Sequence, residues 1–208
     1  MSTKPVKTYS FGQTMRLIHL NHSFDVLDEF ISQLESAWTH SQKRLAAEYD
    51  GLSADRFESE NDMEDYRDFL ADDYYQLNEV RKLGQALAIS GLYAQVELQV
   101  KRVLASAFPD MGQDKKNRVL RGEPVTEIDC STLPEFDAVD ELRLLNNIIK
   151  HAGAVADAKL ASKYPHWQAN EKLFDLDKAY ARLKPLIKQY MRAFVNEAYD
   201  KSTAFGPK

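Results

Sequence analysis

Residues 141–153 read ELRLLNNIIKHAG, and this segment combines an apolar side with a polar side. At about 100° per residue, six apolar residues share one side of a helix. They are Leu142, Leu144, Leu145, Ile148, Ile149 and Ala152. The opposite side carries what we call the polar strip: Arg143, Asn146, Asn147, Lys150 and His151. The apolar side predicts a helix packed against a core, and the polar strip makes this helix a candidate functional site.

Helical periodicity continues through most of the chain, which contains only 8 Gly and 7 Pro among 208 residues. It predicts long helices over 24–49, 61–108, 134–151 and 175–199, with a bend offered by Gly84 or Gly91 in the second. We expect a short helix and turn over 110–122, a loop over 123–134 and an irregular segment over 154–174. Four principal helices with short connections favour an all-α fold, an up-and-down helical bundle of about four to five helices.

Length and composition favour a single helical domain over residues 1–208, with loose termini at 1–16 and 202–208. No apolar run approaches the roughly 18 residues of a membrane span, so no membrane partner is expected. The opening residues, MSTKPVKTYSFGQ, lack the apolar core of a secretory signal. One cysteine, Cys130, excludes an intramolecular disulfide and fits a reducing compartment. We therefore expect a soluble, cytoplasmic protein.

Charge is unevenly distributed behind a net value of −5. Residues 55–76 hold nine acids and two arginines, whereas 81–122 and 150–208 each carry a net charge of +5. Regional basic charge allows a polyanionic partner, although a pI near 5.6 is far from that of a dedicated nucleic-acid binder. One hypothesis is that the acidic segment 55–76 masks the basic surface.

The polar strip has a chemical and a structural interpretation. Chemically, His151 can move a proton near neutral pH, Arg143 and Lys150 can stabilise phosphate charge, and Asn147 can orient the imidazole. Structurally, Lys150 and His151 lie in the last helical turn, where cations interact favourably with free carbonyls, and Gly153 suits a left-handed cap. Spacing alone favours the structural interpretation.

Other reactive residues form no recognisable site. The remaining histidines are scattered, with His19 and His22 expected in a loop, and neither HExxH nor CxxC occurs. No metal site and no cofactor is therefore expected. Cys130 is expected to be incidental or packed. Core or interface packing is expected for three aromatic residues, Tyr74, Tyr75 and Trp167.

Two segments together resemble the HEPN superfamily of all-helical domains. They are SGLYAQVELQVKRVL at residues 90–104 and LRLLNNIIKHAG at residues 142–153. The resemblance covers about residues 78–200. It implies a bundle of four to five helices that forms a homodimer. It also implies metal-independent endoribonuclease activity, which many members carry out in toxin–antitoxin and anti-phage defence systems.

The signature of that superfamily is an arginine followed four to six residues later by a histidine. His151 matches the histidine, Asn147 matches the polar residue after the arginine, and Asn146 occupies the arginine position itself. The resemblance implies that His151 is catalytic and that Arg143 and Asn147 assist it, with Lys150 and Asn146 contacting substrate. Cleavage would begin at the ribose 2′-hydroxyl and leave a 2′,3′-cyclic phosphate.

Two functions remain open at this point. In the first, the protein is a ribonuclease of a defence or toxin-type system, dimeric through the His151 helix, with an antitoxin or other protein as a candidate partner. In the second, it is a HEPN-like module without catalysis that binds RNA or a protein, and the polar strip makes structural hydrogen bonds. The missing arginine favours the second function, whereas His151 and the basic flanks favour the first.

Overall fold

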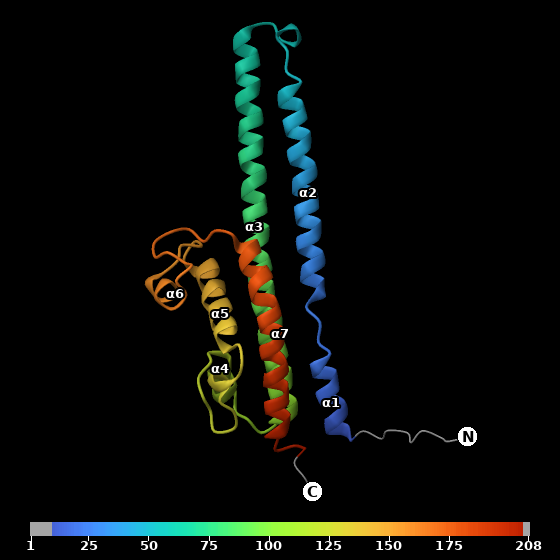
Figure 1. Cartoon of the computed structure of the whole chain (residues 1–208), viewed down its shortest axis with the longest axis vertical. Helices are drawn as coiled ribbons and strands as arrows, with labels where there is room; N and C mark the ends of the chain where they lie inside the picture. Colours follow the sequence, from blue (N-terminus) through green and yellow to red (C-terminus); the bar gives the residue numbers. More distant parts are fainter. Residues whose placement is uncertain (1–9, 206–208) are drawn as a thin grey trace, which may run out of the picture. The chain divides into compact units, whose positions relative to one another are not determined.

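The computed structural model describes residues 10–205 and is helical over most of that range (Figure 1). Its α-helices are α1 (Phe11–Leu20), α2 (Asp25–Asp50), α3 (Glu60–Ala107), α4 (Gln113–Leu120), α5 (Phe136–His151), α6 (Ala158–Lys163) and α7 (Leu176–Asp200). Two short 3-10 turns lie at Ala54–Arg56 and Cys130–Thr132. The described residues contain no strand, although Val155 and Lys172 form an isolated bridge. The predicted all-α helical bundle is confirmed.

The chain divides into two compact units, and α3 contributes to both. Unit 1 comprises residues 1–24 and 89–208, and unit 2 comprises residues 25–88. Unit 1 contains 21 Lys or Arg against 16 Asp or Glu, a net charge of +5. Unit 2 contains 6 against 16, a net charge of −10. The basic and acidic parts of the chain are therefore separate packing units.

The core of unit 1 is built from α5, α7 and the second half of α3. Its fully buried side chains include Leu92 and Leu104 of α3, Leu142 and Leu145 of α5, and Ile187 and Phe194 of α7. Burying one such side chain contributes roughly 1.5–3 kcal/mol relative to leaving it exposed. The apolar side predicted for residues 141–153 is thus the side that anchors α5.

Residues 10–16 were expected in a loose terminus, but they begin helix α1. Ser10 caps this helix, because its Oγ accepts the Gln13 N–H at 3.3 Å while Gln13 Oε1 accepts the Ser10 N–H at 2.9 Å. In the last segment, Ser202 is buried and donates to the Ala107 carbonyl at 2.8 Å. Residues 1–9 and 206–208 of the expected termini lie outside the described residues.

Helix α3 runs without a break past Gly84 and Gly91, the two positions that offered a bend or a short break. Gly84 instead allows α2 and α3 to approach closely in unit 2, because a Cβ there would collide with the Leu34 side chain. Nearby, Arg81 pairs with Glu35 at 2.7 Å and lies 4.2 Å from the centre of the Trp38 ring. These contacts fix the register of a helical hairpin formed by α2 and the first half of α3.

Two local expectations also differ from the structure. His19 lies in α1 instead of a loop, and its buried ring contacts Ser106 Oγ at 3.3 Å. Within the segment expected to be irregular, Asp157 caps α6 by accepting the Leu160 N–H at 2.7 Å.

None of the described helices is both long enough and apolar enough to span a membrane.

Candidate functional site

Asn146, which occupies the position of the arginine in the expected motif, is buried. Only 2% of the residue is exposed, and its Oδ1 has no hydrogen-bond partner among the described residues. It lies on α5 next to Leu145, which is fully buried. In this position Asn146 belongs to the core and does not reach a substrate phosphate.

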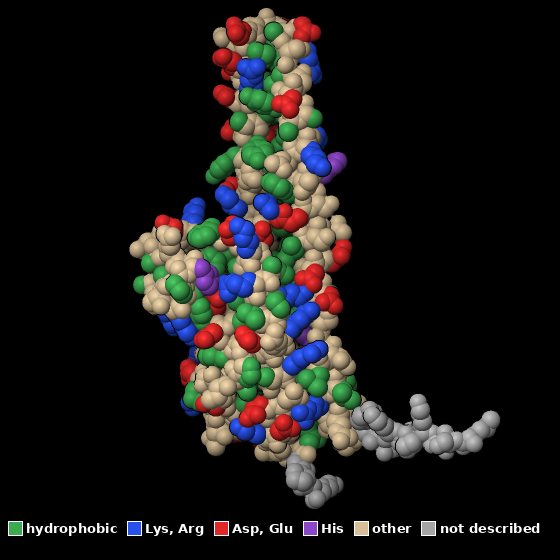
Figure 2. Space-filling view, viewed as in Figure 1, with side chains coloured by type: hydrophobic (Ala, Val, Ile, Leu, Met, Phe, Trp, Pro, Cys, Tyr) green, Lys and Arg blue, Asp and Glu red, His purple; other side chains and the backbone are tan. Residues whose placement is uncertain are grey.

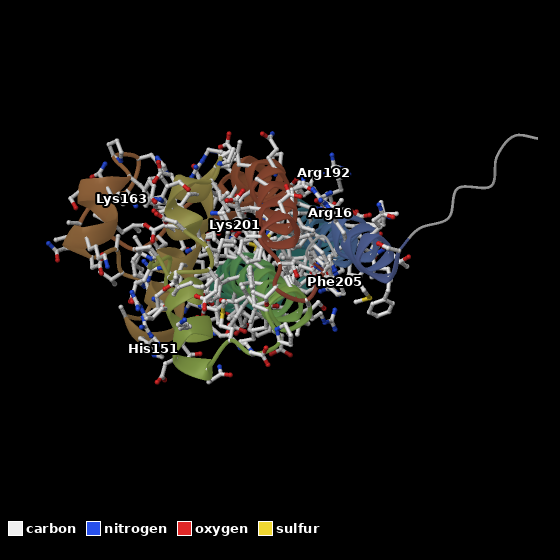
Figure 3. The ribbon with its side chains drawn as sticks, turned by 90° about the horizontal axis from the view of Figure 1, so that it is seen from below. Arg16, His151, Lys163, Arg192, Lys201 and Phe205 are labelled. Atoms are coloured by element: carbon white, nitrogen blue, oxygen red, sulfur yellow. The ribbon has the colours of Figure 1, made fainter. Side chains whose placement is uncertain are left out.

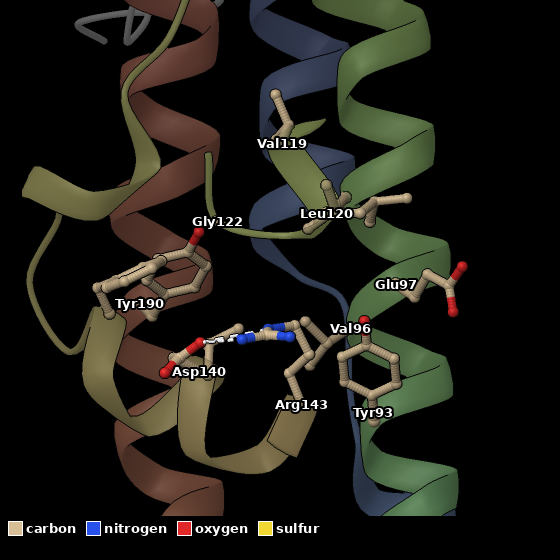
Figure 4. Close-up of a pocket in the computed structure, with 12 residues that line it drawn as sticks. Tyr93, Val96, Glu97, Val119, Leu120, Gly122, Asp140, Arg143 and Tyr190 are labelled. Carbon is tan, nitrogen blue, oxygen red and sulfur yellow. Dashed lines mark hydrogen bonds and ion pairs between the residues drawn. The ribbon is translucent and has the colours of Figure 1, made fainter. Parts of the chain in front are cut away.

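Arg143 is held by a carboxylate on its own helix. Its Nη2 and Nε donate to Oδ1 of Asp140 at 2.6 and 3.2 Å (Figure 4). Asp140 also accepts from Lys163 Nζ at 2.8 Å and from the Tyr164 hydroxyl at 3.1 Å. Burial acts to raise the pKa of Asp140, but hydrogen bonds from Lys163 and Arg143 outweigh it and lower that pKa. Arg143 is therefore part of a partly buried charge cluster.

The Arg143 side chain borders a small hollow between α3, α4 and α5 (Figure 4). Tyr93 and Glu97 line it from α3, and Leu120 lines it from α4. It has room for about one water molecule, so it is not a substrate-sized cleft. His151 does not line this hollow.

The other three residues of the polar strip remain on the open side of α5. Asn147, Lys150 and His151 are exposed, and their side chains make no hydrogen bond or ion pair within residues 10–205. Figure 3 shows His151 at the periphery, well apart from Lys163. Gly153 adopts the left-handed conformation expected of a helix cap, with φ of 60°. Three of the five strip residues are thus available to a partner molecule.

A second cluster forms around Glu141, a neighbour of the polar strip that is only 2% exposed. Its Oε1 accepts hydrogen bonds from Trp167 Nε1 and Arg182 Nη2, both at 2.7 Å. Its Oε2 accepts from Arg182 Nη1 at 2.9 Å, and His166 Nε2 lies 2.7 Å from Oε1. One buried carboxylate therefore joins α5, the segment after α6, and α7.

The electrostatics of this cluster fix both the charge and the orientation of its members. Burial acts to raise the pKa of Glu141, but hydrogen bonds from Arg182, Trp167 and His166 outweigh it, so the pKa is lowered. Arg182 Nη2 also lies 2.8 Å from His166 Nε2. We assign the ring proton to Nε2, which then donates to the ionised Glu141 carboxylate. The approach of Arg182 Nη2 to the same nitrogen is then a contact between two donors that share Oε1, and it is not a hydrogen bond. His166 Nδ1 is then the nitrogen that can accept a proton.

This arrangement is suited to proton transfer beside an anion. A buried carboxylate that holds one imidazole nitrogen orients the ring, so that the other nitrogen can act as a base. The adjacent guanidinium can bind a phosphate oxygen. Both side chains reach solvent, since His166 is 47% exposed and Arg182 is 41% exposed. The structure thus brings together a histidine and an arginine that are not on the polar strip.

Sequence reasoning missed this pair because its members share no local spacing. His166 follows α6, and Arg182 lies 16 residues later on α7. The signal that could have indicated such a site is the acidic pair Asp140 and Glu141 on a strongly apolar helix. Carboxylates buried there need cationic partners.

The remaining candidates of the sequence have mixed outcomes. Cys130 is fully buried, as predicted, and burial raises its pKa to about 11. Trp167 is 5% exposed, so its predicted packing is confirmed. Tyr74 and Tyr75 are 42% and 65% exposed, so they are not core residues, and the interface packing expected as the alternative stays a prediction. The described residues contain no group of side chains that could hold a metal ion.

No protein-family model, curated protein or solved structure matches this chain. The resemblance to the HEPN superfamily therefore rests on residues 90–104 and 142–153. Function has to be argued from the geometry of named side chains.

Proposed function

We propose that this chain is a HEPN-like, metal-independent ribonuclease of a defence or toxin-type system, with His166 and Arg182 as its catalytic pair. The observation that carries the proposal is the position of His166 Nε2, 2.7 Å from Glu141 Oε1 and 2.8 Å from Arg182 Nη2. The net charge of +5 on unit 1 supports a polyanionic substrate.

In the proposed reaction, His166 Nδ1 accepts the proton of a ribose 2′-hydroxyl, and the 2′-oxygen attacks the adjacent phosphorus. The bond from phosphorus to the 5′-oxygen breaks, which leaves a 2′,3′-cyclic phosphate. The departing 5′-oxygen takes a proton from water, and the imidazolium returns its proton to the hydroxide that forms. Arg182 stabilises the phosphorane charge. This reaction requires a 2′-hydroxyl as the nucleophile. RNA has this group and DNA does not, so RNA is the proposed substrate class.

One observation favours a second function, that of a HEPN-like binding module without catalysis. Glu141 is nearly inaccessible, and its contacts also tie the segment after α6 to α5 and α7. In this alternative the cluster is structural. The exposed Asn147, Lys150 and His151 would then contact RNA, a second copy of the chain through α5, or an antitoxin-like partner.

Incubation with a mixed RNA pool in EDTA separates the two functions. We expect the wild-type protein to cleave RNA and to leave 2′,3′-cyclic phosphate ends. His166→Ala should lower the cleavage rate by about a hundredfold or more. Arg182→Lys keeps the charge but loses the planar fork, so it should give a smaller loss.

Thermal denaturation of each variant shows whether it is folded, and His166→Asn provides a second variant of the same position. Equal cleavage by the wild-type protein and a folded His166 variant would contradict the catalytic proposal. Absence of cleavage by the wild-type protein would do the same. Either result would favour the second function.

A further inference from the structure

A stripe of exposed residues follows α3 through unit 2. Residues separated by steps of three or four share one face of a helix. The exposed residues in this register, which we call the α3 stripe, are Asp62, Asp65, Phe69, Asp72, Gln76, Val80, Leu83 and Leu87. At about 1.5 Å per residue, the stripe is roughly 37 Å long.

The α3 stripe has an apolar end and an acidic end. At the apolar end Val80 and Leu83 are each 60% exposed, and Leu87 is 54% exposed. The acidic end carries Asp62, Asp65 and Asp72 around Phe69, which is 57% exposed. Figure 2 shows hydrophobic, acidic and some basic side chains on the visible face of the hairpin of α2 and α3. Single exposed apolar residues are normal, but Val80, Leu83 and Leu87 lie on successive turns of one face and together form a contact surface.

The α3 stripe is distinct from the face of α3 that packs on α2. The packed face is marked by Asn78, Arg81 and Gly84, which meet Trp38, Glu35 and Leu34 of α2. Because the stripe lies beside this face, α2 does not cover it. Phe30 of α2 is 40% exposed and lies one turn from Leu34, at the level of the apolar end.

We propose that the α3 stripe binds a helix of a partner protein whose matching face is apolar at one end and rich in Lys or Arg at the other. Apolar side chains at steps of three and four are the anchors by which a groove or helix face holds an amphipathic helix. Exposed carboxylates further along the same face attract cations and set the orientation. The net charge of −10 on unit 2 adds to this attraction.

A second copy of the stripe fits this face in neither direction. Parallel pairing would place Asp65 and Asp72 against the same residues of the copy. Antiparallel pairing along the full stripe would place Asp62 and Asp65 against Leu87 and Leu83, where their charge would be unpaired. The charge pattern of the stripe therefore disfavours pairing with itself and favours a helix whose far end is basic.

Two synthetic helical peptides of about 25 residues test the proposal. The first carries Leu in one half and Lys in the other, at steps of three and four, and the second has Glu in place of each Lys. Fluorescence anisotropy with the full-length protein should show binding of the Lys peptide and not of the Glu peptide. Leu83→Ser combined with Leu87→Ser should weaken binding at least about tenfold. Asp65→Asn combined with Asp72→Asn should weaken binding at low salt and flatten its salt dependence.

The matched control is Tyr74→Ser combined with Glu64→Gln, two exposed residues of α3 that do not lie three or four positions from any residue of the stripe. It should bind the Lys peptide as the wild-type protein does. The proposal is overturned if the wild-type protein does not bind the Lys peptide or if the control loses as much affinity as the stripe variants. A concentration-dependent dimer that Leu83→Ser abolishes would overturn it in favour of a second copy. RNA cleavage should proceed at the wild-type rate in all these variants. Failure of the peptide-binding proposal can therefore be distinguished from failure of the ribonuclease proposal.

Discussion

Nε2 of His166 lies 2.7 Å from Oε1 of Glu141, 25 residues earlier in the chain and only 2% exposed. This contact closes the segment after α6 back onto α5. The Glu141 carboxylate therefore holds that segment in place and also orients the His166 imidazole. Substitution at position 141 should therefore affect both stability and the proposed activity.

Glu141→Gln should lower the free energy of unfolding by about 2 kcal/mol, because it removes the charge that accepts from Arg182 and Trp167. The matched control is Asp137→Asn on the same helix, whose side chain is 80% exposed and lies 3.5 Å from Lys163. This control should change stability by less than about 0.5 kcal/mol. Urea denaturation measures both values, and equal effects would argue against a structural role for Glu141.

Stability should fall in acid partly through Asp140 and Glu141. The pKa of each carboxyl group is lowered in the folded protein. Their contribution is therefore complete above the unfolded-state pKa values of about 3.9 and 4.3, and it is lost as the pH falls through the folded values. The urea midpoint of the wild-type protein should drop more steeply between about pH 5 and pH 3 than that of Asp140→Asn. If the urea midpoints of the two proteins fall equally with pH, the hydrogen-bond partners of Asp140 do not stabilise its ionised side chain.

Arg143→Ala tests whether this arginine replaces the missing arginine of the motif. Since Arg143 is bound to Asp140, we expect the variant to lose about 1 kcal/mol of stability. Its rate of RNA cleavage should stay within about twofold of the wild-type rate. A loss of a hundredfold in a folded variant would instead support Arg143 as a catalytic residue, as the polar strip predicts.

Gly122→Ala should destabilise unit 1 more than Gly153→Ala does. Both glycines have positive φ, so each alanine carries a backbone cost of about 1 kcal/mol. At Gly122 the new Cβ would also lie 2.6 Å from the Phe136 ring, whereas nothing lies within 4 Å at Gly153. Thermal denaturation should separate the two variants, and equal melting temperatures would show that Phe136 moves aside freely.

The fold could be predicted from the sequence because helical periodicity is local. The apolar side of residues 141–153 predicted the buried Leu142, Leu145 and Ile148. The polar strip was less informative, because periodicity does not show how wide the buried arc of a helix is. Asn146 lies at the edge of the strip, and the core includes it.

The Glu141 cluster could not be predicted in the same way. His166 and Arg182 meet only after α6 and the segment behind it fold back onto α5 and α7. No fixed spacing encodes that approach. The start of α1 was missed although its cap is local. Ser10 and Gln13 form a capping box that can be read from their spacing of three residues.

The central claim is that His166, and not His151, is the catalytic histidine. Its most direct test is the single-turnover rate of RNA cleavage by His166→Ala and by His151→Ala, measured in EDTA on proteins shown to be folded. We predict a loss of about a hundredfold or more for His166→Ala and a rate near that of the wild-type protein for His151→Ala. The opposite order would contradict the account and would return catalysis to the polar strip of α5.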